Sequence, residues 1–161
     1  FLKLKKNFGI KNLGFSVYKP SEIEKTLLLP FKATYQFPIN IADQRFLNIK
    51  ISKNKTFARS IFLQGLLTNI KIYKRNLPSD LLKSHRSYHD YLKSLKIDPI
   101  VLSLSFINKL KNIGFFLVGI DNTQQLESIV KANLYNNVDI KLINKLNSFF
   151  YKKYVDPRKW S

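Results

Sequence analysis

The chain has no cysteine, and its 161 residues include only five glycines, six prolines and two histidines. The lack of cysteine excludes disulfide bonds, thiolate metal sites and covalent thiol catalysis. His85 and His89 have the i, i+4 spacing of a helical metal pair, but Asp90 is the nearest carboxylate and no cysteine can join them. We therefore expect no metal site and no cofactor.

Acidic residues are also scarce, with ten Asp and Glu against 28 Lys and Arg and a formal net charge of +18. A globular protein with this excess repels itself unless it meets a polyanion, so nucleic acid is the expected partner. The carboxylates show no paired acid/base arrangement, no Ser-His-Asp set is evident, and the glycines form no phosphate loop. The sequence thus predicts a protein that is not an enzyme, with no catalytic residue and no small-molecule substrate.

Long hydrophobic runs are missing as well. The longest, residues 113–120, has the length of a strand and is far shorter than the roughly 20 residues needed to cross a bilayer, so we expect no membrane insertion. What is abundant is Lys, Asn, Ile, Phe and Tyr, which together make up nearly half of the chain. Their codons are rich in A and T, which favours an organelle genome and a location in the mitochondrial matrix, although an A/T-rich nuclear or bacterial genome fits too.

The positive charge is unevenly distributed along the chain. Residues 45–79 contain eight basic residues and no acidic one, whereas residues 114–143 contain two basic and three acidic residues. This gradient predicts that one side of the protein faces phosphates. The predicted RNA-binding residues are Arg45, Lys50, Lys53, Lys55, Arg59, Lys71, Lys74 and Arg75. A second set of candidates follows in the chain: Lys83, His85, Arg86, His89, Lys93 and Lys96.

The clearest local pattern is a capped helix after residue 122. Asn122 is a natural N-cap, and Gln125 completes a capping box three residues later. An apolar stripe with helical spacing follows, formed by Leu126, Ile129, Val130 and Leu134. Residues 138–142 then alternate between apolar and charged side chains, which predicts a half-buried strand.

Three further strands and one further helix follow from similar patterns. They are a strand at 45–51, a helix at 56–70, a strand at 71–74 and a strand at 115–118. The order β-α-β, insertion, β-α-β is that of a ferredoxin-like α+β domain, an antiparallel four-stranded sheet with both helices on one face. This predicts an N-terminal extension at 1–44, a domain at 45–143 with an insertion at about 80–113, and a basic C-terminal tail at 144–161, the two ends being extended arms.

The second half of this pattern resembles the S-ten family of small-subunit ribosomal proteins. That family ends in T-x-x-T-V-D-A-L-M-x-L-x-L-x-x-G-V-D-V-x-I, on which Asn122 takes the capping threonine, Asn137 the glycine and Val138-Asp139-Ile140 the V-D-V. Asn76-Leu77-Pro78-Ser79 stands where the family has P-L-P-T. The resemblance covers much of residues 45–143 and neither terminal arm.

The resemblance implies a structural constituent of the small subunit of a mitochondrial ribosome. Such a protein would bind ribosomal RNA in the subunit head and contact neighbouring ribosomal proteins. Two other interpretations stay open. One is a non-catalytic accessory subunit of another mitochondrial assembly, such as a respiratory complex. The other is an intron-encoded nuclease, because residues 116–121 resemble part of the LAGLIDADG motif, with Asp121 as its metal-binding aspartate.

Overall fold

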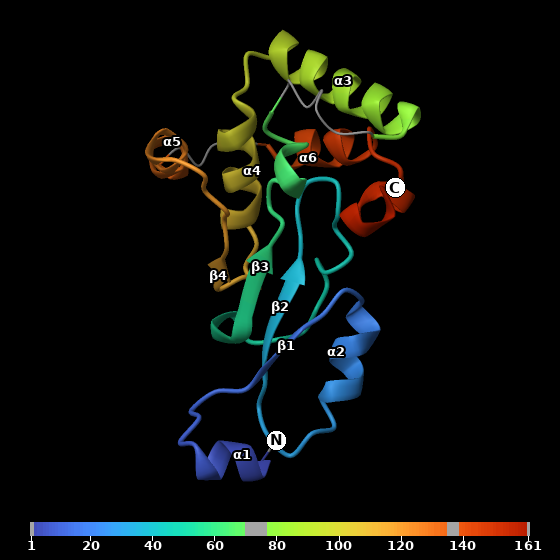
Figure 1. The fold of residues 1–161 in the computed structure, drawn as a ribbon. Helices are drawn as coiled ribbons and strands as arrows, with labels where there is room; N and C mark the ends of the chain where they lie inside the picture. Colours follow the sequence, from blue (N-terminus) through green and yellow to red (C-terminus); the bar gives the residue numbers. More distant parts are fainter. Residues whose placement is uncertain (1, 70–76, 135–138, 161) are drawn as a thin grey trace.

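A four-stranded parallel sheet lies at the centre of the protein, as seen in the computed structural model, which describes residues 2–69, 77–134 and 139–160. The strand order is β1-β2-β3-β4, so each strand pairs with its neighbour in the sequence (Figure 1). All three pairings are parallel. The strands are β1 (Gly14–Ser16), β2 (Thr34–Pro38), β3 (Thr56–Arg59) and β4 (Phe115–Phe116).

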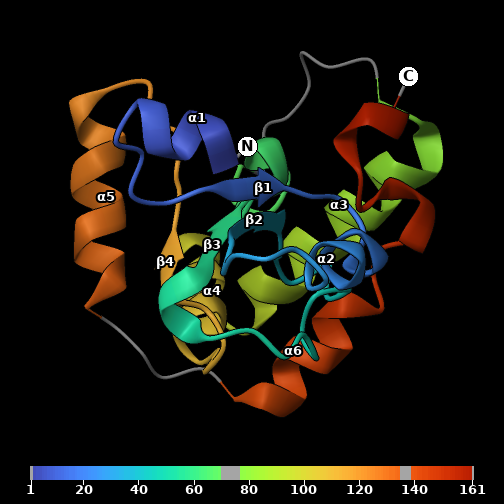
Figure 2. The ribbon, with the colours of Figure 1, turned by 90° about the horizontal axis from the view of Figure 1, so that it is seen from below.

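The described residues also form six α-helices, of which α1 precedes the first strand and the others connect or follow the strands. They are α1 (Leu2–Asn7), α2 (Pro20–Thr26), α3 (Ser79–Ser94), α4 (Pro99–Asn108), α5 (Thr123–Asn133) and α6 (Ile140–Asn147). Figure 2 shows α2, α4 and α6 on one side of the sheet. In Figure 1, α1 lies beyond the N-terminal ends of the strands and α3 beyond their C-terminal ends. Short 3-10 turns occur at Lys53–Lys55, Leu63–Gly65, Lys152–Tyr154 and Pro157–Lys159.

The core lies between the sheet and these helices. Tyr35 and Phe37 of β2 and Ala58 of β3 are buried, and Phe37 pairs with Ala58 in the parallel register. Phe46, which follows β2 in a loop, stacks on Phe37 with ring centroids 4.6 Å apart. On α4 the residues from Leu102 to Ile107 are all buried, because this helix is apolar around most of its circumference.

Side-chain caps explain where three helices begin. The Asp98 carboxylate accepts hydrogen bonds from the first amides of α4, and the Asp139 carboxylate accepts one from Lys141 in α6. The Asn122 side chain accepts a hydrogen bond from the Gln125 amide at 2.9 Å, which confirms the predicted N-cap of α5. The Gln125 side chain reaches the amide of Asp121 and not that of the cap itself.

The two histidines are buried in the contact between α3 and the loop after β3. His85 Nε2 lies 2.9 Å from the Asn69 carbonyl oxygen, and His89 Nε2 lies 3.1 Å from that of Leu66. Burial lowers the pKa of both imidazoles, because it disfavours their charged form. Among the described residues no group of three or more potential ligands could hold a metal ion.

The predicted antiparallel ferredoxin-like sheet is wrong, since the observed sheet is parallel throughout. Residues 45–51 form successive turns, with Leu47 N–H donating to Gln44 and Ile49 N–H to Phe46, so their alternation reflects a loop packed on the core. The predicted helix at 56–70 begins instead as β3. Residues 140–142 belong to α6, because Asp139 caps a helix there.

The predicted terminal arms and insertion are also built differently. Residues 1–44 contain β1, α2 and β2, and they are therefore part of the sheet. Residues 80–113 form most of α3 and all of α4. The predicted strand at 71–74 lies outside the described residues. In the part of the chain that the structure describes, no helix is both long enough and apolar enough to span a membrane.

Candidate functional site

A cavity of about 880 Å³ lies beyond the C-terminal ends of β3 and β4, against the first turn of α5. Its walls come from three segments: the loop after β3, the segment that joins β4 to α5, and the start of α5 itself, with one residue from α4. The lining residues are Ser60, Ile61, Phe62, Gln64, Gly65, Thr68, Asn69, Ile100, Leu117, Val118, Gly119, Asp121, Asn122, Gln124, Gln125, Ser128 and Ile129.

The loop after β3 has an unusual backbone. Ser60, Leu63 and Gln64 have φ angles of 56°, 47° and 53°, and Gly65 has a φ of 85°. The first three are not glycine, so each conformation costs about 1–3 kcal/mol and persists only where the surroundings hold it. Such strain is concentrated at ligand sites in proteins, and here Ser60 and Gln64 both line the cavity.

The strained loop is held by the buried side chain of Asn40. Its Nδ2 donates a hydrogen bond to the Ser60 carbonyl at 3.0 Å, and its Oδ1 accepts from the amides of Ala42 and Asp43. The Ile39 amide donates to the Arg59 carbonyl, which extends the pairing of β2 with β3. The ends of these two strands are thus fixed at the point where the loop begins.

The β4 wall is fixed by a hydroxyl on β3. Thr56 Oγ1 lies 2.8 Å from the carbonyl oxygens of Lys53 and Asn112, and it accepts a hydrogen bond from the Gly114 amide at 2.9 Å. Gly114 has to be small, because a Cβ there would come within 2.0 Å of the Lys53 carbonyl oxygen. Gly119, by contrast, lines the cavity and has no atom within 4 Å of the place where a Cβ would stand.

The start of α5 offers donors to an anion. The first amides of an α-helix have no acceptor within the helix, and the helix dipole adds positive potential at that end. Asn122 satisfies only the amide of Gln125. Asp121 lies one residue before the cap and is joined to Gln125, whose Oε1 accepts from the Asp121 amide and whose Nε2 lies 3.4 Å from Asp121 Oδ2.

The described part of the cavity wall carries little charge. Among the described residues that line it there is neither lysine nor arginine, and Asp121 is the one ionisable group. The remaining polar groups are the amides and hydroxyls of Gln, Asn, Ser and Thr residues. The described part of the wall therefore offers a ligand neutral hydrogen-bonding groups and a helix N-terminus.

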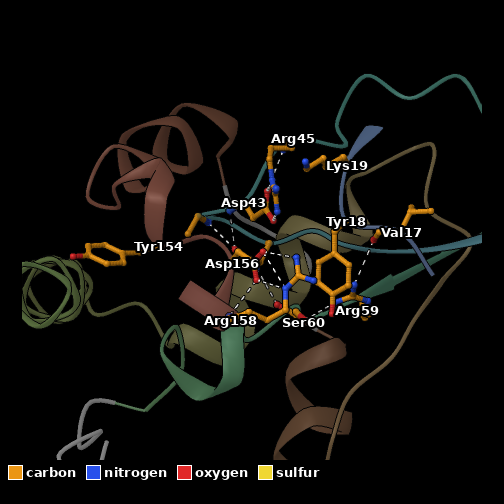
Figure 3. A network of polar contacts seen from close by, with 12 residues as sticks. Val17, Tyr18, Lys19, Asp43, Arg45, Arg59, Ser60, Tyr154, Asp156 and Arg158 are labelled. Carbon is orange, nitrogen blue, oxygen red and sulfur yellow. Dashed lines mark hydrogen bonds and ion pairs between the residues drawn. The ribbon is translucent and has the colours of Figure 1, made fainter. Parts of the chain in front are cut away.

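A cluster of arginines lies near the same edge of the sheet (Figure 3). The arginine cluster consists of Arg45, Arg59 and Arg158. The Tyr18 ring lies between two of them, with the guanidinium carbons of Arg59 and Arg158 at 4.1 and 3.4 Å from its centroid. The Nη2 atom of Arg59 also lies 3.4 Å from the Val17 carbonyl oxygen.

Two carboxylates neutralise the other charges of the arginine cluster. The Asp43 side chain is fully buried and pairs with Arg45 at 2.7 Å, which raises the pKa of that arginine. Asp156 pairs with Arg158 at 2.6 Å, and this contact lowers the pKa of the carboxyl. The cations at this edge are thus already engaged within the protein.

The structure does not bring the predicted RNA-binding residues together on one element. Arg45 and Arg59 belong to the arginine cluster, whereas Lys50, Lys53 and Lys55 lie on the segment that leads into β3. Lys71, Lys74 and Arg75 lie outside the described residues. Exposed positions on α3 or just after it are taken by Lys83, Arg86, Lys93 and Lys96, while His85 and His89 are buried. Their role in binding RNA stays a prediction from the sequence.

The fold is similar to that of aldo-keto reductases. The holo form of aldo-keto reductase AKR11C1 from Bacillus halodurans matches with a TM-score of 0.69 and 17% sequence identity, over 97% of this chain and 57% of that chain. The apo form matches with a TM-score of 0.70 and 17% identity, over 97% of this chain and 58% of that chain. This chain spans less than two thirds of the reductase chains, and at such identity the likeness establishes the fold alone. No family model and no curated protein matches the sequence.

These matches correct the functional expectations drawn from the sequence. The two solved structures named above are aldo-keto reductases, and their fold is not the antiparallel one expected for the S-ten family of ribosomal proteins. The following predictions are therefore wrong: a ribosomal constituent, a non-enzymatic protein, the alternative accessory subunit, and ribosomal RNA and ribosomal proteins as partners.

One wall of the cavity is formed by elements that the sequence predicts, although the sequence did not indicate a cavity there. The capped helix after Asn122 and the strand just before Gly119 were both predicted, but they were assigned to an antiparallel sheet. In a parallel sheet the same strand-to-helix connection marks the edge where ligands bind. The left-handed loop at 60–65 was missed, because Ser60, Leu63 and Gln64 are not residues whose type predicts a positive φ.

Proposed function

We propose that this chain carries the cofactor-binding part of an oxidoreductase of the aldo-keto reductase type, and that the cavity binds a nicotinamide dinucleotide. The observation that carries the proposal is the position of the cavity. It lies beyond the C-terminal ends of two neighbouring parallel strands and is bounded by a helix N-terminus. Parallel α/β sheets and barrels bind their ligands at this edge, and helix N-termini favour phosphate groups.

The residues that line the cavity fit such a cofactor. The first turn of α5 offers backbone amides for a diphosphate, and Ser60 of the strained loop adds a hydroxyl. The amides of Leu63 and Gly65 in that loop already donate to the carbonyls of Ser60 and Phe62. Ile100, Leu117 and Ile129 provide apolar surface for a base or a ribose. The side chain missing at Gly119 leaves open space at the wall. A volume of about 880 Å³ falls within the range of cofactor pockets.

The cofactor would supply a hydride, which together with one proton converts a carbonyl group to an alcohol and leaves the nicotinamide oxidised. The part assigned to this chain is binding and orientation. The loop at 60–65 and the α5 N-terminus would hold the diphosphate, while Asn40 keeps the loop in place through the Ser60 carbonyl. That the substrate is a carbonyl compound, and that the protein reduces it, are also parts of this proposal.

Titration of the full chain with NADH and NADPH, followed by nucleotide fluorescence and by calorimetry, tests this function. We expect saturable binding of at least one of the two. Gly119→Glu should weaken that binding at least about tenfold, because it places a charged side chain in the cavity. The fold should be unchanged, since the position is open and free of strain.

Val130→Glu is the matched control. It adds the same side chain to α5 at a position that is 56% exposed and outside the cavity. This variant should bind as the unmodified protein does. The proposal is overturned if neither nucleotide binds, or if Gly119→Glu binds as tightly as the control.

A further inference from the structure

We infer that the protein binds the surface of an anionic phospholipid bilayer through the end of the molecule where its strands begin. This basal surface consists of three segments: residues 2–13, residues 25–33 and the turn Lys53–Lys55. Figure 2, which views the protein from below, looks onto this end. The cavity lies at the opposite edge of the sheet, so the basal surface is separate from the proposed cofactor site.

The three segments lie together because each one leads directly into a parallel strand. The first precedes β1, the second β2 and the third β3, and parallel neighbours begin at the same edge of a sheet. Hydrogen bonds also join the segments. The Thr34 amide donates to the Leu13 carbonyl at 2.9 Å, and Lys55 Nζ lies 3.4 Å from Asn12 Oδ1. The three segments therefore form one continuous surface.

Apolar side chains of the basal surface are exposed to solvent. Leu28 is 90% exposed, Phe8 is 73% exposed and Leu27 is 60% exposed. The other exposed apolar side chains of these segments are Leu4, Ile10 and Leu29. A single exposed leucine is ordinary, but a group of this kind marks an interaction site. Leucine and phenylalanine enter the boundary between headgroups and acyl chains when a protein lies on a bilayer.

The same surface carries lysines without acidic neighbours in sequence. They are Lys3, Lys5, Lys6, Lys11, Lys25, Lys32, Lys53 and Lys55, and the three segments contain no acidic residue. Within the described residues none of these lysines forms an ion pair. Lysine reaches lipid phosphates on a flexible stem, and each one near an anionic surface strengthens binding. A polyanion with no apolar interior would leave the leucines in water, whereas a bilayer accommodates both groups.

The exposed apolar residues of α5 provide a comparison. Leu126, Val130 and Leu134 are 44%, 56% and 78% exposed. This helix carries Glu127 as well as Lys131, so its charges balance. An anionic bilayer attracts the basal surface and does not attract α5, because only the basal surface combines apolar side chains with an excess of cations.

Co-sedimentation of the full chain with lipid vesicles tests the inference. At a salt concentration of about 0.1 M, vesicles of phosphatidylcholine with about 30% phosphatidylserine should bind the protein at least about tenfold more tightly than phosphatidylcholine alone. Leu28→Glu should weaken binding to the anionic vesicles at least about tenfold, because it replaces an inserted apolar side chain with a charge that these lipids repel. The double variant Lys5→Gln, Lys6→Gln should weaken it by a similar factor.

The matched controls make the same changes on α5 and α6. They are Leu134→Glu and the double variant Lys131→Gln, Lys141→Gln, all at exposed positions outside the basal surface. Both should bind the anionic vesicles within about twofold of the unmodified protein, since charges beyond the Debye length of a surface contribute little.

Fluorescence of Leu28→Trp reports where this side chain lies. With anionic vesicles its emission should shift to shorter wavelength and be quenched by brominated lipid, whereas that of Leu134→Trp should do neither. The buried Trp160 contributes the same background to both variants.

Three results would each overturn the inference: anionic vesicles that bind the protein no better than neutral ones, a Leu28→Glu variant that binds as tightly as Leu134→Glu, or a Leu28→Trp emission that vesicles do not change. The second result would show general adsorption of a basic protein. Self-association that Leu28→Glu abolishes, without any vesicle binding, would assign the basal surface to a second copy of the chain instead.

Discussion

The arginine cluster and the cavity lie at the same edge of one sheet, yet their electrostatics are opposite. In the arginine cluster every cation has a partner: Arg45 and Arg158 pair with carboxylates, and Arg59 stacks on Tyr18. In the cavity the described lining residues include no cation, and the polar groups are amides, hydroxyls and the Asp121 carboxylate. A net charge of +18 therefore says little about where a ligand binds.

The comparison shows that a charged side chain already paired within the protein is not available to bind a ligand. A guanidinium group that is paired and packed stabilises the fold, and drawing it away to bind a phosphate would break that pairing. A wall of neutral amides and hydroxyls can exchange hydrogen bonds with a ligand without breaking an ion pair. Variants that disturb one region and spare the other can test this division.

The largest effect is expected from Asp43→Asn. The carboxylate is fully buried and binds Arg45 through two side-chain contacts, at 2.8 and 2.7 Å. Removing its charge leaves the guanidinium group without a counter-ion and should lower the free energy of unfolding by about 3 kcal/mol. Chemical denaturation measures this loss. Glu127→Gln, at an exposed position, should change stability by less than about 0.5 kcal/mol, and equal losses in both variants would contradict the assigned role.

A somewhat smaller effect is expected on the cavity side, from Thr56→Val. The change keeps the shape of the side chain but leaves the Gly114 amide and the Asn112 carbonyl without their hydroxyl partner. The free energy of unfolding should fall by about 2 kcal/mol. Thr56→Ser retains the hydroxyl and should lose less. If denaturation showed the serine variant to be the less stable of the two, packing of the methyl group would be the dominant contribution.

Tyr18→Leu should cost about 1 kcal/mol, since it removes the ring that lies between Arg59 and Arg158. Tyr18→Phe keeps the ring face and should retain most of that energy. Thermal unfolding of the two variants side by side measures the difference. The arginine cluster touches the cavity wall where Arg59 Nη1 lies 3.5 Å from the Ser60 hydroxyl. This is a long contact, so the affinity for dinucleotide should change by less than about twofold in both variants, and a large loss of affinity would show that the two regions are coupled.

The smallest effect concerns pH. Burial lowers the pKa of His85 and His89 below the ordinary value of about 6.5, so below that pH the unfolded chain binds more protons than the folded one. The free energy of unfolding should therefore be fully maintained above pH 7 and should decline as the pH falls below about 6.5. His89→Gln keeps an N–H donor for the Leu66 carbonyl and should flatten this decline. An equally steep decline in that variant would assign it to other groups.

Features of the fold could be predicted from the sequence where they depend on residues close together in the chain. The Asn122 cap, the helix that follows and the short strand at Phe115 depend on side chains within a few residues of each other, and the structure contains all three. The pairing of strands is not local. Thr56 and Ala58 also satisfy helical spacing, and only their pairing with Tyr35 and Phe37 makes them part of a strand.

The candidate site was harder to predict for the same reason. Its walls come from segments more than 50 residues apart, and the hydrogen bond from Gly114 to Thr56 that joins them spans 58 positions. The density of basic residues in the sequence predicted a binding surface elsewhere, since the described residues that line the cavity are neutral apart from Asp121. Asp139 illustrates a related difficulty, because an aspartate between apolar residues fits an alternating strand as well as the cap of α6.

The outer strands of the sheet have a practical consequence. β1 and β4 lie at its two margins, and neither is paired on its outer side with another strand of the described residues. Phe115 on β4 is also 53% exposed. Open margins can template pairing with another chain, but β1 has only three residues and β4 only two, so each presents few unpaired backbone groups. The brevity of the outer strands therefore protects this sheet from edge-to-edge aggregation.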